Sequence, residues 1–243
     1  MRKLFALLLL FVPLQLFGAE LGYPLDRSPA DPRDLVSLQA GARTFVNYCL
    51  GCHGAQYMRY NRLTELGLSE AQIRDNLMFT ASKVGETMKT IMPAKEAKGW
   101  FGVAPPDLSV VARSRGADWL YTYLRTFYRD PKTPTGWNNA VFPNVSMPHA
   151  LWGLQGERAL AVEAGKEPGE QERVQYEWTQ LTEGGETTVQ YDATVRDLVN
   201  FLVYVGEPAA VSRRAIGIVV LFALGVLFII AYLLKLAFWK DVK

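Results

Sequence analysis

The feature that most constrains this chain is an uninterrupted apolar stretch near its C-terminus. Residues 215–234 read AIGIVVLFALGVLFIIAYLL and include no charged side chain, whereas Arg214 and Lys235 stand directly at its two ends. At 1.5 Å per helical residue, about 20 residues cross a hydrocarbon core of roughly 30 Å. The pattern predicts one transmembrane helix over residues 213–235, followed by a short tail over residues 236–243.

The N-terminus has the features of an export signal. Arg2 and Lys3 precede a short apolar run that Pro13 interrupts, and small residues end the run at Ala19. A basic start, a short apolar run and small residues before a cleavage point are typical of a secretory signal peptide. The run is too short for a second membrane helix. The sequence therefore predicts a signal peptide over residues 1–19.

Residues 20–212 are then expected to form one exported head. The charges beside the apolar stretch are nearly balanced, so the orientation follows from the export signal. We predict a single-pass protein of the bacterial inner membrane, with its head in the periplasm, its tail over residues 236–243 in the cytoplasm, and the lipid bilayer as a partner.

Composition excludes several classes of protein. Twenty-six Lys and Arg against 24 Asp and Glu give a formal charge of +2, which excludes a strongly basic nucleic-acid-binding protein. Two cysteines exclude a disulfide framework and any zinc or iron–sulfur site with four cysteines, and two histidines exclude most histidine-rich metal clusters.

The two cysteines stand in a single short motif. Cys49-Leu50-Gly51-Cys52-His53 has the C-x-x-C-H spacing of covalent c-type haem attachment. Thiols one helical turn apart can add to the two vinyl groups on one edge of the porphyrin, and the next residue, His53, can then bind the iron as the proximal ligand. We predict one covalently bound haem c.

Three other interpretations of the motif compete with haem attachment. A thioredoxin-like redox pair would stand between a strand and a helix. A structural disulfide between Cys49 and Cys52 would close a very tight loop. A zinc site built from these cysteines with His53 and His149 is disfavoured because Cys52 and His53 are adjacent and would struggle to reach one tetrahedral ion.

The sequence offers several candidates for the sixth iron ligand: Met58, Met78, Met88, Met92, Met147 and His149. Met58 is close to His53 in the sequence, and Met78 and Met88 stand in stretches with helical character, where core packing is the ordinary role. Met92 and Met147 are the leading candidates because a following proline stiffens each loop. Met147 also lies in an aromatic, turn-rich run suited to enclose a haem, and His149 is a lesser candidate.

The spacing of apolar residues predicts a mainly α-helical head with long loops. Leu38, Ala42 and Phe45 recur at helical intervals before the motif, with Asp34 as the N-cap. The pattern at residues 194–197 predicts a capping box, which would begin a second helix with a buried stripe. Loops are expected at residues 133–136, 165–169 and 184–185.

Taken together, several motifs resemble the cytochrome c1 family, whose members are the haem subunits of quinol–cytochrome c oxidoreductase. They are the C-x-x-C-H motif at residues 49–53, PPDLS at residues 105–109 with Arg113 and Arg115 after it, Met147-Pro148, and Glu207-Pro208 before a single C-terminal membrane helix. The resemblance runs from about residue 35 to the C-terminus. It implies a cytochrome c-like helical haem domain with one membrane anchor.

The resemblance also implies roles for individual residues. Met147 is expected as the sixth ligand, and Pro106 is expected to pack against the haem. Arg115 is expected to pair with a haem propionate, with Arg113 as the adjacent alternative. Arginine suits this role because its planar guanidinium is always charged and can bind a carboxylate with two hydrogen bonds.

The implied activity is electron transfer within the cytochrome bc1 complex. By resemblance, the protein accepts an electron from the Rieske iron–sulfur protein, lies beside cytochrome b, and passes the electron to a soluble or tethered cytochrome c in the periplasm. It breaks no substrate bond and is not an enzyme by itself. The alternative is an independent membrane-tethered cytochrome c that serves a terminal oxidase.

One segment of the head is strongly acidic. Residues 151–200 carry ten acidic and four basic side chains, and most of the acidic ones lie between residues 157 and 192. Such a run is ordinarily a solvated loop. The sharper hypothesis is a docking face for a basic soluble cytochrome, because opposite charge accelerates the encounter of transient partners.

Overall fold

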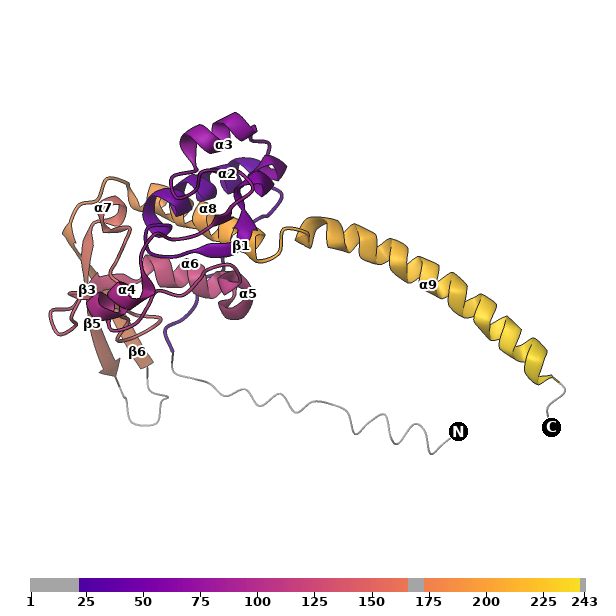
Figure 1. Ribbon diagram of the computed structural model, residues 1–243. Coiled ribbons are helices and arrows are strands. Elements are labelled where there is room, and N and C mark those ends of the chain that lie inside the picture. The colour runs from indigo at the N-terminus through magenta and orange to yellow at the C-terminus, as the bar shows by residue number, and fades with distance from the viewer. Residues whose placement is uncertain (1–21, 166–172, 241–243) are drawn as a thin grey trace.

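The computed structural model describes residues 22–165 and 173–240, which form a head of helices and small sheets with one long helix projecting from it (Figure 1). The predicted signal peptide lies outside the described residues, as do residues 166–169 of one predicted loop and the last three of the tail. The helices of the head are α2 (Leu35–Thr44), η2 (Phe45–Cys49), η3 (Tyr60–Leu66), α3 (Glu70–Asn76), α4 (Ala94–Phe101), α5 (Val111–Arg115), α6 (Ala117–Arg125), α7 (Trp152–Gln155) and α8 (Thr188–Gly206).

The helix before the cysteine motif begins and ends for identifiable reasons. The Asp34 carboxylate accepts a hydrogen bond of 3.0 Å from the backbone N–H of Ser37, so the predicted N-cap is confirmed. At its C-terminal end the helix widens into the π-helical turn η2, where the Leu50 N–H donates to the Phe45 carbonyl five residues earlier at 2.9 Å. This turn leads directly to Cys49.

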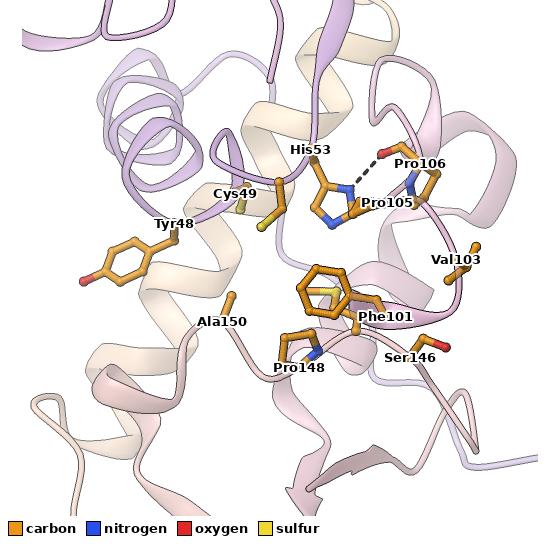
Figure 2. Close-up of a pocket in the computed structure, with 12 residues that line it drawn as sticks. Tyr48, Cys49, His53, Phe101, Val103, Pro105, Pro106, Ser146, Pro148 and Ala150 are labelled. Atoms are coloured by element: carbon orange, nitrogen blue, oxygen red, sulfur yellow. Dashed lines mark hydrogen bonds between the residues drawn. The ribbon is translucent and has the colours of Figure 1, made fainter. Parts of the chain in front are cut away.

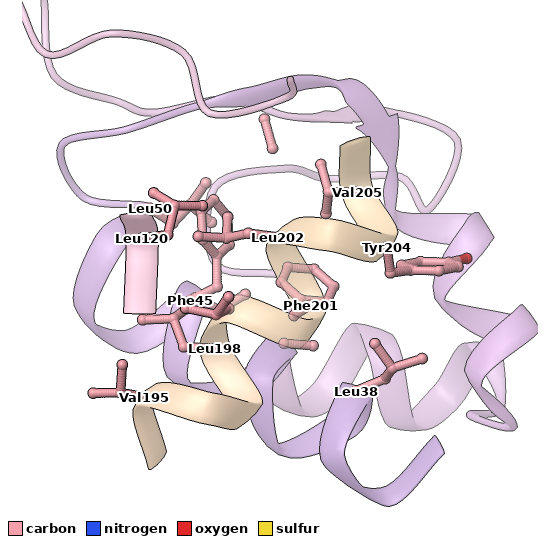
Figure 3. Packing of buried hydrophobic residues seen from close by; sticks show 14 of the residues in the cluster. Leu38, Phe45, Leu50, Leu120, Val195, Leu198, Phe201, Leu202, Tyr204 and Val205 are labelled. Carbon is pink, nitrogen blue, oxygen red and sulfur yellow. The ribbon is translucent and has the colours of Figure 1, made fainter. Parts of the chain in front are cut away.

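The core of the head forms where α2 crosses α8 (Figure 3). Its largest aliphatic and aromatic members are fully buried, among them Leu38, Phe45, Leu198 and Phe201. The helices approach closely because Gly41 has no side chain: a Cβ at this position would overlap the backbone carbonyl of Asp197. A glycine therefore sets the distance between the helix that carries the motif and the helix that supports it.

The start of α8 differs from the sequence prediction. The capping box lies at Thr187 and Gln190, seven residues before the predicted one, and Thr194 lies inside the helix. Thr187 precedes Gln190 by three residues, so this earlier pair satisfies the same pattern and nucleates the helix first. The Thr194 hydroxyl instead donates a 3.0 Å hydrogen bond to Glu186.

The described residues also form three small antiparallel sheets, each with two strands. They pair β1 (Ala55–Arg59) with β2 (Thr87–Met88), β3 (Phe127–Arg129) with β4 (Trp137–Asn139), and β5 (Glu157–Gly165) with β6 (Arg173–Thr182). The prediction of a mainly α-helical head is thus confirmed only in part. Helices build the core, but part of the predicted loop structure is β-sheet.

The acidic segment is the largest departure from the expected loops. Residues 157–165 and 173–182 form a β-hairpin, and only the turns around residues 184–185 match the prediction there. On one face of the hairpin, Tyr23 from the N-terminal segment packs its ring 4.6 Å from that of Tyr176 and 6.3 Å from that of Trp178. This distant aromatic partner supplies the burial that the hairpin requires.

The C-terminal helix α9 (Ala210–Trp239) is longer than the predicted span over residues 213–235. It is the one helix among the described residues that is long and apolar enough to cross a membrane, and it leaves the head as a separate rod (Figure 1). Helical hydrogen bonding does not stop where the apolar stretch ends, because Arg and Lys are good helix formers. The first residues of the predicted tail are therefore helical.

Two methionines with predicted helical surroundings are placed differently. Met88 lies on strand β2 and is fully buried in the core, and Met78 follows the end of α3 and packs against the core from its edge. The predicted helical surroundings are wrong for both residues: Met88 lies on β2, which forms only through pairing with β1, and Met78 lies after the last residue of α3. Their predicted role in core packing agrees with their position.

Candidate haem site

Two adjoining cavities in the head are lined by most of the residues that the sequence singled out. The first has a volume of about 100 Å³ and the second about 310 Å³. The side chains that line both are Cys49, His53, Val103, Pro106, Ser146 and Met147. The first cavity also includes Cys52, so both cysteines and the histidine of the motif line it (Figure 2).

The backbone of the motif folds into one tight turn. The N–H groups of Cys52 and His53 both donate to the Cys49 carbonyl, at 3.0 and 2.8 Å. This turn follows directly on the π-helical turn η2. It places both cysteines beside the cavity and directs the histidine into it.

The chemistry of the two thiols differs from that of a redox pair. Both cysteines are free, and burial together with the neighbouring Cys52 raises the pKa of Cys49 to about 12. Burial also raises the pKa of Cys52. Thioredoxin-like motifs lower a thiol pKa to stabilise the reactive thiolate. Raised pKa values and a position between a π-turn and a strand disfavour the thioredoxin-like interpretation.

A backbone carbonyl holds the ring of His53 in place. Its Nδ1 lies 2.7 Å from the Pro106 carbonyl oxygen, so Nδ1 carries the hydrogen and donates it (Figure 2). Burial lowers the pKa of His53, against the opposing effects of this hydrogen bond and of Asp107. The neutral ring thus presents the lone pair of Nε2 to the cavity, as a metal-ligating histidine does.

The loop of Met147 lies across the cavity from the histidine. Its neighbours Ser146 and Pro148 lie below Phe101 in Figure 2, and His53 lies above it. The Sδ atom of Met147 accepts a hydrogen bond of 3.3 Å from the Tyr123 hydroxyl. Burial raises the pKa of Tyr123, which therefore stays protonated and is the donor.

The other candidates for a sixth ligand lie elsewhere. His149 is 2% exposed, its Nε2 lies 2.8 Å from the Gln155 side-chain oxygen, and its ring stacks on Phe127 at 4.8 Å. Burial lowers the pKa of His149 to about 3, so this ring is neutral and serves the core. Met92 lines a separate pocket that includes Cys52 but not His53.

The two arginines after PPDLS are separated by the fold. Arg115 lines the larger cavity, and its guanidinium lies 5.1 Å from the ring centre of Trp119 and 5.7 Å from that of Phe142. Arg113 lies two residues earlier on α5, and its side chain packs beside the end of α8, where its Cγ is close to Gly206. Of the two, only Arg115 lines either of the two cavities.

A zinc site is disfavoured by where the histidines lie. His149 is buried in the aromatic core and bonded to Gln155, whereas His53 faces the cavity. Within residues 22–165 and 173–240, no three His, Cys, Asp or Glu side chains gather closely enough to hold a metal ion.

Several residues of the site were not predicted from the sequence. They are Phe101 from α4, Trp119 and Tyr123 from α6, and Leu198 and Leu202 from α8, all of which line one of the cavities. Leu198 and Leu202 are buried in the core, and they line the larger cavity as well. The spacing of Trp119 and Tyr123, four residues apart on α6, is the one signal that marks a common helical face.

Comparison with known proteins identifies the family. A sequence model described as Cytochrome C1 family matches residues 78–242. Over the full chain, the sequence is 48% identical to cytochrome c1 of Allochromatium vinosum and covers 100% of that protein. The chain belongs to the cytochrome c1 family. It is also 49% identical, over 100% of the chain and 99% of the relative, to a Nitrosomonas europaea protein named ammonia monooxygenase gamma subunit. Cytochrome c1 of Rhodospirillum rubrum is 29% identical over 86% of this chain and 83% of that protein.

Membership of the cytochrome c1 family assigns the general role of the chain. It is a c-type cytochrome of the cytochrome bc1 complex, an electron-transfer subunit that binds haem, and α9 fits the single membrane anchor of a bacterial cytochrome c1. The predicted resemblance is confirmed. The matched segment begins after the cysteine motif, and the full-length relatives extend the similarity over it.

The residues of the cytochrome c1 site suit a covalent haem. The first cavity is lined by two protonated thiols, by a neutral imidazole with a fixed tautomer, and by a thioether sulfur. The lining of both cavities is predominantly apolar. A porphyrin needs apolar walls for its faces and a cation near its propionates. Arg115 at the larger cavity provides the cation.

Proposed function

We propose that this protein accepts one electron from the Rieske iron–sulfur protein of the bc1 complex and passes it to a periplasmic cytochrome c. The observation that carries the proposal is the arrangement of His53 and the Met147 loop across one cavity that also includes Cys49 and Cys52. A nitrogen ligand and a sulfur ligand on opposite sides suit a closed iron centre that carries electrons and binds no small molecule.

Each residue of the motif has a distinct part in this proposal. Cys49 and Cys52 would hold one haem c through thioether bonds, and His53 and Met147 would be its axial ligands. The bound haem would supply a one-electron redox centre. The Pro106 carbonyl keeps the His53 ring oriented, and the apolar walls exclude water, so little rearrangement accompanies a change of charge.

The haem-facing arginine and the proline have supporting parts. Arg115 would pair with a propionate, because its guanidinium lines the larger cavity while Arg113 packs elsewhere. Pro106 lines both cavities and would pack on the haem face. A propionate inside a protein requires a fixed positive partner, since an isolated buried charge is costly.

The membrane arrangement completes the proposal. The head, residues 20–212, would lie in the periplasm, α9 would cross the inner membrane, and a short tail would lie in the cytoplasm. This arrangement would keep the haem beside cytochrome b and the Rieske protein. Figure 1 supports this arrangement, because α9 leaves the head as a long rod and the described head does not extend along the apolar part of this helix.

Purification of the membrane protein in mild detergent tests the function. We expect it to co-purify with a haem-b subunit and an iron–sulfur subunit, and to carry haem that acid–acetone does not extract. An alkaline pyridine spectrum of the denatured protein measures that haem. Isolation of the chain without a haem-b or iron–sulfur subunit would favour the alternative, a tethered cytochrome c that serves a terminal oxidase. Absence of haem would overturn both.

The acidic hairpin is proposed as the docking face for a basic cytochrome c. Several acidic side chains of this region are already paired within the head: Glu157 with Arg129, Asp192 with Arg125, and Asp197 with Arg196. Glu163 and Glu177 are exposed, and because Glu177 pairs with Ala161 in the register, both side chains lie on the same face of the hairpin. This face is therefore an acidic surface open to a partner.

Reversal of these two charges gives the test. In the double variant Glu163→Lys/Glu177→Lys, the rate constant for electron transfer to a basic soluble cytochrome c should fall about tenfold or more at low ionic strength, and depend less on salt. Stopped-flow kinetics over a range of salt concentrations measure both. The matched control is Glu70→Lys/Asp75→Lys, which reverses two exposed charges on α3, away from the hairpin. An unchanged salt dependence in the hairpin variant would rule out this docking face.

A further inference from the structure

The Tyr123 hydroxyl donates a hydrogen bond of 3.3 Å to the Sδ atom of Met147. Tyr123 lies on α6 and lines the larger cavity, with 7% of its side chain exposed. A thioether sulfur is a weak acceptor that seldom determines where a phenol points. The bond therefore indicates a role for the Tyr123 hydroxyl when other contacts hold the phenol ring in place.

Aromatic neighbours hold the ring of Tyr123 from two sides. Trp119, one helical turn earlier, stacks on it with centroids 4.7 Å apart and planes 11° from parallel. Phe127 meets it edge to face at 5.0 Å. The guanidinium of Arg115 lies over the Trp119 ring at 5.1 Å from its centre, a cation–π contact that also holds this ring in place.

A buried asparagine links the tyrosine to the methionine loop. The fully buried Asn139 donates from Nδ2 to the Tyr123 carbonyl at 2.7 Å. Its side-chain oxygen accepts from the backbone N–H groups of Val141 and Phe142, at 2.9 and 3.1 Å. One side chain thus ties the C-terminal turn of α6 to the segment that leads to Met147, so the two partners of the Tyr123–Met147 bond belong to one rigid unit.

We propose that Tyr123 is a positioning residue that orients the Met147 sulfur and weakens it as an electron donor, and so raises the reduction potential of the centre. The inference rests on the proposed role of Met147 as an axial ligand. A donated hydrogen bond withdraws electron density from the sulfur lone pairs, which favours the reduced form of the iron over the oxidised form. The tuned reaction is the addition of one electron, with no bond broken and no proton moved.

The variant Tyr123→Phe removes the hydroxyl and keeps the ring that stacks on Trp119. We expect its midpoint potential, measured by a spectroscopic redox titration of the detergent-solubilised holoprotein, to fall. The equilibrium constant for reduction by a fixed partner should decrease about twofold to tenfold, the effect of one hydrogen bond. The sulfur–iron absorption should persist, because Met147 keeps its place.

Two comparisons make the result decisive. The matched control is Tyr121→Phe, which removes a hydroxyl from the same helix at a residue that lines neither cavity, and its potential should equal that of the wild type. In a Met147→Leu background, Tyr123→Phe should no longer change the potential, because the sulfur through which it acts is gone. An unchanged potential in the single variant, or an equal shift in both backgrounds, would overturn the inference.

These comparisons also separate the inference from the function on which it rests. If Met147→Leu keeps the sulfur–iron absorption and the wild-type potential, the ligand assignment of Met147 is wrong. If Met147→Leu loses both but Tyr123→Phe changes nothing, the ligand assignment stands and the role of Tyr123 is refuted.

Discussion

Replacement of both motif cysteines, in the variant Cys49→Ser/Cys52→Ser, should abolish covalent retention of haem. The two thiols lie beside one cavity, and no other cysteine in the chain can replace them. Serine is close to cysteine in size but does not form a thioether. Acid–acetone extraction followed by the alkaline pyridine spectrum of the residue should detect haem in the wild type and none in the double variant.

The single variants and the fold provide the controls for this experiment. Cys49→Ser and Cys52→Ser each retain one thiol, so each should keep haem that resists extraction. Tyr48→Phe changes another residue that lines the same cavity and should retain haem fully. The double variant should also unfold at lower denaturant concentration, because a group bound only by the folded state stabilises it. Haem that still resists extraction from the double variant would contradict covalent attachment through this motif.

Replacement of the proposed sulfur ligand, in the variant Met147→Leu, should remove the sulfur–iron absorption and lower the reduction potential. Leucine preserves the volume and apolar character of methionine, so the loop between Ser146 and Pro148 should keep its fold. It has no lone pair to offer a metal. Axial ligands set haem potentials over a range of about 0.8 V, so the fall should be large compared with that expected for Tyr123→Phe. A redox titration and an absorption spectrum measure both effects.

The matched control for this ligand is Met92→Leu. Met92 also precedes a proline, but it lines a pocket that does not include His53. Its replacement should leave the sulfur–iron absorption and the potential unchanged. Retention of both properties in Met147→Leu, together with their loss in Met92→Leu, would transfer the role of ligand to Met92. If neither variant loses these properties, His149 becomes the candidate for the sixth ligand.

Features carried by neighbouring residues were predictable from the sequence. The Asp34 cap depends on a carboxylate three residues before the N–H that it binds, and the membrane helix depends on one uninterrupted apolar stretch. The cysteine motif is likewise local, since both thiols and the histidine lie within five residues. In each case the contacts join residues that lie within about one or two helical turns of each other. The spacing in the sequence therefore approximates the spacing in the structure.

Features that depend on distant partners were not predictable in this way. The hairpin of residues 157–165 and 173–182 packs its aromatic face on Tyr23, more than a hundred residues earlier in the chain. The separation of Arg113 from Arg115 depends on the end of α8, and the role of Asn139 depends on the meeting of α6 with a later loop. Sequence patterns record which side chains are apolar or charged, but not which of them meet after folding.

By itself, the sequence determined that this protein has one apolar stretch long enough for a membrane helix and one motif able to hold a covalent haem, because each depends on residues adjacent in the chain. It also carried the resemblance that the comparisons confirmed. The tertiary structure decided which methionine loop faces His53, which arginine reaches the cavity, and that a tyrosine hydroxyl bonds to the Met147 sulfur. These are contacts between α6, α8 and loops far apart in sequence, and only the packing of the whole head brings them together.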